Sequence, residues 1–108
     1  MLTGEIWHFD LGEPVDPEAG FDHFGLVVSP PRFTGPLRMV CPITSTRRPY
    51  PWRVEIEPTP DNGLKVVSYV QTEHLRSIAV RRGDYRLGAV DQVTLFTVKR
   101  IIKTLLDL

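Results

Sequence analysis

Hydrophobic and polar residues alternate along most of the chain in short runs, a pattern typical of β-strands. The runs are bounded by Gly, Pro and Asn residues that favour turns, and they predict strands at residues 5–11, 25–29, 37–43, 52–57, 64–71 and 85–88. Residues 12–24 contain two glycines and two prolines and are predicted to form a long polar loop. Near the end the period changes to that of a helix, with apolar residues at Leu95, Val98, Ile101, Ile102 and Leu105.

This pattern favours a mainly β fold with a C-terminal helix, in which a small, strongly bent antiparallel sheet or partly open barrel is covered by the helix. The apolar face of the helix could instead contribute to a subunit interface. Asp91 is a suitable N-cap residue for this helix. Pro42 cannot donate to a strand ladder, so we expect it at a sheet edge or a bulge. Trp7 and Phe9 share one face of the first strand, which places His8 on the opposite face, exposed to solvent.

Length and composition narrow the class of protein. A chain of 108 residues is expected to form one domain, residues 1–108, and its 42% hydrophobic and 24% charged fractions are those of a soluble globular protein. No apolar run approaches the roughly 18 residues of a membrane span, and the N-terminus lacks the features of a signal peptide, so a cytoplasmic location without membrane attachment is expected. The single cysteine, Cys41, rules out an internal disulfide, and its apolar surroundings suggest a buried, inert thiol.

The net charge of zero conceals an uneven distribution. Residues 1–22 carry six acids and no Lys or Arg, whereas residues 23–54 carry five arginines and no acid. Within the basic part, an apolar strand ends in Thr44, Ser45 and Thr46 and is followed by Arg47 and Arg48. Hydroxyls beside two guanidiniums could hold a phosphodiester. A solvated turn is the alternative interpretation of the two arginines.

Aromatic residues flank this segment. Tyr50 and Trp52 could stack unpaired bases for about 1–3 kcal/mol each, although Trp52 is equally suited to core or dimer-interface packing. The three histidines are scattered, with no Cys or carboxylate at metal-ligand spacing, so no metal site is expected.

Several segments, taken in order, resemble one protein family. They are Gly-Glu-Ile-Trp-His-Phe-Asp-Leu at 4–11, Gly-Leu-Val-Val-Ser at 25–29, Val-Cys-Pro-Ile-Thr-Ser at 40–45, Glu-His-Leu-Arg-Ser-Ile at 73–78 and Leu-Gly-Ala-Val-Asp at 87–91. Together they resemble the MazF/PemK (Kid-like) toxins of type II toxin–antitoxin systems. The resemblance implies an SH3-like, partly open barrel of the type shared with CcdB, a homodimer, and a cognate antitoxin partner. It also implies sequence-specific cleavage of single-stranded RNA, without metal or other cofactor, through a 2′,3′-cyclic phosphate.

The resemblance also implies site residues. In the family a Thr at the end of the third strand and an Arg after the first loop carry the chemistry; Thr44 matches the first, but His23-Phe24 stands where the family has Arg-Pro. We hypothesise that His23 acts as the acid–base group, since imidazole exchanges protons near neutral pH. A solvated or capping loop histidine is the alternative for His23, as a plain strand end is for Thr44.

Further residues are predicted to contact RNA. Ser45 would help Thr44 to hold the phosphate, and Arg47, Arg48 or Arg76 would supply positive charge. His74 occupies the family's Gln position beside Arg76 and is a second acid–base candidate. Glu18, where the family often has Glu, could hydrogen-bond a base edge.

Two other functions stay open. One is a gyrase-binding toxin of the CcdB type, which is disfavoured because the chain ends Leu-Leu-Asp-Leu and lacks the Trp-Gly-Ile on which that action depends. The other is a weakly catalytic family member that acts through antitoxin binding.

Overall fold

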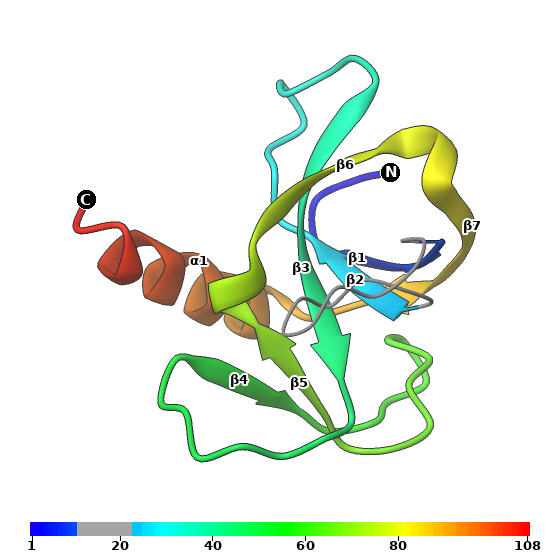
Figure 1. Ribbon diagram of the computed structural model, residues 1–108. Helices are drawn as coiled ribbons and strands as arrows, with labels where there is room; N and C mark the ends of the chain where they lie inside the picture. The colour runs from blue at the N-terminus through cyan, green and yellow to red at the C-terminus, as the bar shows by residue number, and fades with distance from the viewer. Residues whose placement is uncertain (11–22) are drawn as a thin grey trace.

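The computed structural model describes residues 1–10 and 23–108. Figure 1 shows a strongly curved antiparallel sheet with a helix near the C-terminus. The elements are β1 (Glu5–Phe9), β2 (His23–Val27), β3 (Leu37–Thr44), β4 (Arg53–Ile56), β5 (Ser68–Gln71), η1 (Thr72–His74), β6 (Arg76–Ala79), η2 (Val80–Arg82), β7 (Gly83–Ala89) and α1 (Gln92–Leu105). The strand order is β4-β5-β3-β2-β1-β7, with β6 also pairing β3. In the described part of the chain the end strands β4 and β7 do not pair, so the predicted mainly β, partly open architecture with a C-terminal helix is confirmed.

Strand β3 organises the sheet because it pairs with three other strands. Its first half, Leu37–Val40, pairs with β6, its end pairs with β5, and β2 lies along its other side. Pro42 is buried between these two halves, opposite Gly25 of β2, so its predicted place at an edge or bulge was wrong. The missing N–H is tolerated because β3 changes partner from β6 to β5 at this step, and neither strand pairs with Pro42.

Both faces of the sheet are covered, which explains why residues 25–28 are apolar without alternation. One apolar cluster contains Ile6, Leu26, Cys41 and Val98 of α1, whereas the smaller one contains Phe9, Val27, Val40 and Ile78. Trp7 packs against the cluster that contains Phe9, as predicted for residues on one face. At Gly25 an added Cβ would lie 2.5 Å from Val40 Cγ1 and 3.0 Å from Phe9 Cε2, so only glycine lets these side chains cross β2.

The helix α1 begins as predicted. Asp91 caps it by accepting a hydrogen bond from the Thr94 N–H at 2.7 Å, and this bond lowers the pKa of Asp91 below its usual value. Leu95 and Val98 are buried against the sheet. Among the described residues, no helix has the length and apolar character needed to cross a membrane.

Strand boundaries differ from the prediction where tertiary contacts decide them. Strand β5 begins at Ser68 and not at Leu64, because the Asn62 side chain accepts hydrogen bonds from Thr59 N and Leu64 N and holds the preceding residues in a turn. Strand β2 begins at His23, which pairs with Phe9. Strand β6 was not predicted.

Candidate nucleic-acid-cleaving site

Thr44 ends β3 at the point where the chain leaves the sheet. Its Oγ1 accepts a hydrogen bond from Thr46 N at 3.1 Å, which leaves the hydroxyl proton to be donated elsewhere. Thr44 borders two cavities. The larger, here named the Thr44 cavity, has a volume of about 680 Å³, and the smaller, the Arg48 cavity, has about 410 Å³.

His23 lies next to Thr44 in the sheet. Residues Phe24 and Ile43 form the outermost pair of the β2–β3 register, and continuing that register by one residue sets His23 opposite Thr44. Side chains at opposed positions share a face of the sheet. His23 also lines the Thr44 cavity, together with Ser45. Sequence reasoning placed His23 in a loop; the structure instead makes it the first residue of β2, because it pairs with Phe9.

A second histidine lines the Thr44 cavity and was not predicted there. The His8 side chain is 18% exposed, and its Nδ1 lies 2.8 Å from Asp84 Oδ2. Its ring stacks on Tyr85 with centroids 5.0 Å apart and planes 7° apart, and Phe24 meets it edge-on. The expectation that His8 is exposed to solvent was therefore wrong, because the β1–β7 register sets Tyr85 directly beside it.

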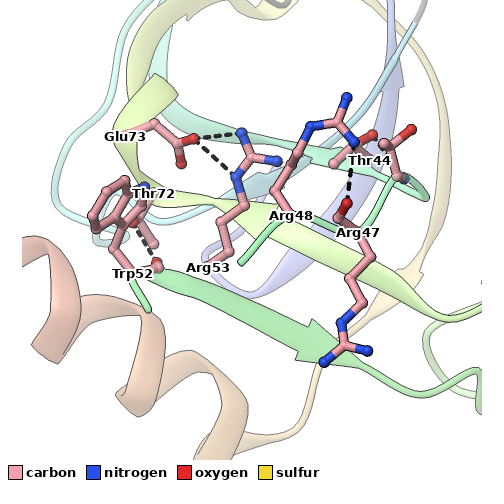
Figure 2. A network of polar contacts seen from close by, with 8 residues as sticks. Thr44, Arg47, Arg48, Trp52, Arg53, Thr72 and Glu73 are labelled. Atoms are coloured by element: carbon pink, nitrogen blue, oxygen red, sulfur yellow. Dashed lines mark hydrogen bonds and ion pairs between the residues drawn. The ribbon is translucent and has the colours of Figure 1, made fainter. Parts of the chain in front are cut away.

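One of the two arginines in the loop after β3 lies near Thr44. Figure 2 shows the Arg48 guanidinium beside Thr44, whereas the Arg47 side chain extends away. Arg48 Nη1 donates to the Arg47 carbonyl at 3.1 Å, and both side chains are exposed. The Arg48 cavity is also lined by His74 of η1, so each acid–base candidate lines one of the two cavities that Thr44 also lines.

Arg53 is compensated by an acid that the sequence did not associate with it. Its Nε and Nη2 donate to Glu73 Oε2 at 2.8 and 2.5 Å, and the Arg53 side chain is only 9% exposed (Figure 2). Burial raises the pKa of Glu73, but the hydrogen bonds and charge of Arg53 outweigh it and hold that pKa below its ordinary value. The basic field expected over residues 23–54 is thus partly neutralised, because η1 brings Glu73 onto β4.

Aromatic packing fixes the loop that carries Arg48. The Arg53 guanidinium lies over the Tyr50 ring, 4.8 Å from its centroid, and Tyr50 stacks on Trp52 with centroids 5.1 Å apart. The Trp52 carbonyl accepts a hydrogen bond from the Thr72 hydroxyl at 2.6 Å, and Trp52 lines neither cavity. Its contacts are therefore those of packing, the alternative to a base-stacking role.

Two other candidates lie apart from the cavities. Arg76 begins β6 opposite Val40, which shares a face of β3 with Thr44, but Arg76 lines neither cavity. Glu18 lies outside the described residues.

The family model of the PemK-like, MazF-like toxins of type II toxin–antitoxin systems matches residues 2–106. The chain belongs to this family. It is similar to Endoribonuclease MazF9 of Mycobacterium tuberculosis (strain ATCC 25618 / H37Rv), with 33% identity over 116 residues that cover 100% of this chain and 98% of that protein. The match to MazF/PemK toxins does not favour the CcdB-like alternative.

Solved structures agree with this assignment. A crystal structure of MazF from Deinococcus radiodurans has a TM-score of 0.85 and 27% identity, and the match covers 100% of this chain and 97% of that one. A crystal structure of MazE-MazF from the same organism has a TM-score of 0.75 and 26% identity, over 98% of this chain and 94% of that one.

Two observations on this MazF-like toxin bear on metal and thiol chemistry. No group of three or more His, Cys, Asp or Glu within residues 1–10 and 23–108 is placed to hold a metal ion. Burial, with a smaller contribution from the charge of Glu73, raises the pKa of Cys41 to about 12. A buried thiol with this pKa is not a nucleophile at neutral pH.

Proposed function

We propose that this MazF-like chain is a toxin-type endoribonuclease that cleaves single-stranded RNA at specific sequences without a metal ion. The observation that carries the proposal is the position of Thr44, which lines the same cavity as His23 and lies beside the Arg48 guanidinium. The relative named Endoribonuclease MazF9 supports the same activity.

The residues around Thr44 suit attack by the RNA's own 2′-hydroxyl. One histidine removes the 2′ proton, the 2′ oxygen attacks the adjacent phosphorus, and the bond from phosphorus to the 5′ oxygen breaks as a second group protonates that oxygen. The products are a 2′,3′-cyclic phosphate and a free 5′-hydroxyl. His23 and His74 line different cavities, and Thr44 lines both, so the two histidines would serve opposite ends of this displacement.

Thr44 and the basic loop would stabilise the phosphorane. The Thr44 hydroxyl, which accepts from Thr46 N, donates its proton to a non-bridging oxygen. Ser45 lines the Thr44 cavity and adds a second hydroxyl, whereas Arg48 supplies positive charge from the other side. Arg47 and Arg76 would contact the RNA backbone farther from the reacting phosphate.

We further propose that residues 1–108 form a single toxin domain that works as a homodimer in the cytoplasm, where its RNA substrate is found. The exposed Val93 and Phe96 on α1 provide apolar surface for assembly. A MazE-like antitoxin is the proposed partner, since a similar MazF was solved as MazE-MazF.

Incubation of the purified protein with mixed-sequence RNA in EDTA tests the function. The wild type is expected to produce ends with 2′,3′-cyclic phosphate and 5′-hydroxyl groups. His23→Ala should abolish cleavage while circular dichroism and the melting temperature stay close to those of the wild type. Arg32→Ala is the matched control, because Arg32 is exposed on a loop that borders neither cavity.

The outcomes separate the alternatives. Undiminished cleavage by His23→Ala would reject the role of His23 but not the nuclease. Gyrase inhibition without RNA cleavage would support a CcdB-like toxin. If the protein neither cleaves RNA nor inhibits gyrase, the result would favour a chain that acts only through its antitoxin.

A further inference from the structure

The Thr44 cavity has one wall that proton transfer does not require. This wall is the stacked pair of His8 on β1 and Tyr85 on β7, with Phe24 set edge-on against both rings. Both rings line the same cavity as Thr44. An aromatic wall beside the reacting group is suited to a flat, apolar ligand face.

The wall is held in one orientation before any ligand binds. The Asp84 carboxylate can only accept a hydrogen bond, so the 2.8 Å contact makes His8 Nδ1 the donor and fixes the ring. Asp84 precedes Tyr85 on β7, so the same strand supplies both the anchor and the stacking ring. Preorganised rings lose little conformational freedom when a ligand stacks on them.

Tyr85 combines this fixed position with open surface. It contacts His8 on one side, yet 49% of the residue is exposed. Tyr85 lies on β7, the end strand of the sheet in the described part of the chain. Its ring can therefore accept a second planar partner.

The remaining lining of the cavity combines apolar side chains, among them Ile43, Leu64 and Leu87, with several polar groups. Ser45, Thr46 and Ser68 contribute hydroxyls, and Lys65 contributes an ammonium group. Hydroxyls can donate to or accept from the edge of a base, and an ammonium can bind a phosphate. At about 680 Å³ the cavity is within the range of small-ligand sites, which spans roughly 300–1,000 Å³.

We propose that the His8–Tyr85 wall is the subsite for one unpaired RNA base adjacent to the scissile phosphate, with Asp84 positioning His8. The inference rests on the proposed nuclease function. A sugar links each base to its phosphate, so a base stacked at this wall sets the adjoining phosphate near Thr44, on the rim of the same cavity. Tyr85 is the base-binding residue of this subsite: every base offers a flat face to stack, so the ring binds a base without selecting which one.

The test compares intact and abasic oligonucleotides once the cleaved sequence has been mapped. Each position flanking the cleavage point is made abasic in turn, and kcat/KM is measured for the wild type, Tyr85→Ala and Tyr85→Phe. For the wild type, one abasic position should lower kcat/KM by roughly 5- to 150-fold, the range expected for loss of one base–aromatic stack.

The variants identify the partner of that base. With Tyr85→Ala, the kcat/KM values for intact and abasic substrates should lie within about threefold of each other. Tyr85→Phe keeps the ring and should retain the wild-type difference between the two substrates. Asp84→Ala should weaken the discrimination between intact and abasic RNA, because His8 loses the carboxylate that fixes its ring. Phe33→Ala is the control, since Phe33 is an exposed aromatic residue that lines neither cavity.

Two results would overturn the inference while leaving the nuclease intact. One is an equal loss of kcat/KM by Tyr85→Ala on intact and abasic RNA, which would indicate a structural role. The other is a ratio of kcat/KM between intact and abasic RNA that is as large for Tyr85→Ala as for the wild type. Absence of any cleavage by the wild type would overturn the proposed function and this inference together.

Discussion

Thr44→Val removes one hydroxyl and leaves the shape of the side chain almost unchanged. Two consequences can be separated. The variant loses the acceptor of the 3.1 Å hydrogen bond from Thr46 N, and it loses the proton that we propose is donated to the phosphate. Valine retains the β-branch that suits the end of a strand, so backbone preferences should not change.

The structural loss should be small and the catalytic loss large. Thr46 is exposed, so water can replace the Thr44 oxygen as the partner of its N–H, and we expect a cost of roughly 0.5 kcal/mol in unfolding free energy. A donor to developing negative charge is worth about 2–4 kcal/mol, which corresponds to roughly a 30- to 1,000-fold loss in kcat. Activity should thus fall far more than stability can explain.

Thermal melts and single-turnover cleavage in EDTA measure the two effects on the same preparations. Thr44→Ser is the matched variant, because it keeps the hydroxyl and should remain within about tenfold of the wild-type rate. Cleavage by Thr44→Val at a rate within about threefold of the wild type would refute the assignment of Thr44 as a transition-state donor. A drop of many degrees in melting temperature would show that its main role is structural.

Two further predictions concern the groups with shifted pKa values. For Glu73, the pKa lies below its ordinary 4.5 in the folded chain, so its ionised form stabilises the protein above about pH 4.5 and this contribution is lost as pH falls through the lowered value. Glu73→Gln should therefore melt at a lower temperature than the wild type at pH 7, with the gap narrowing at pH 3; a gap that does not change with pH would contradict this. For Cys41, whose pKa is raised to about 12, a thiol reagent at pH 8 should label the protein only after denaturation, and rapid labelling of the folded chain would contradict the burial.

The helix and the core strands could be predicted because their signals are local. The Asp91 cap and the helical spacing of Leu95 and Val98 each depend on residues near one another in sequence. Strand β6 could not be predicted in this way. Its residues 76–79 are held by pairing with β3, nearly 40 positions earlier, and their own pattern does not alternate clearly.

Candidates for the site could be named from the sequence only in part. Thr44 is a candidate because hydroxyl and basic residues adjoin in the chain, and His23 because of its position in a family motif; the roles of both stay predictions. The contact between His8 and Asp84 was missed, since no local pattern links two residues that lie near opposite ends of the chain. Glu73 was missed as the partner of Arg53, which made the basic region look less compensated than it is.

The sequence by itself determined the class of fold, the capped helix and the strand end that carries Thr44, because hydrophobic periodicity and capping are properties of adjacent residues. Only the tertiary structure decided what surrounds Thr44. The β1–β7 register sets His8 opposite Tyr85, the pairing of β2 with β3 brings His23 to the cavity that Thr44 lines, and η1 brings Glu73 onto Arg53. These contacts join residues far apart in sequence, and a shift of one residue in either register would turn the side chains to the other face of the sheet.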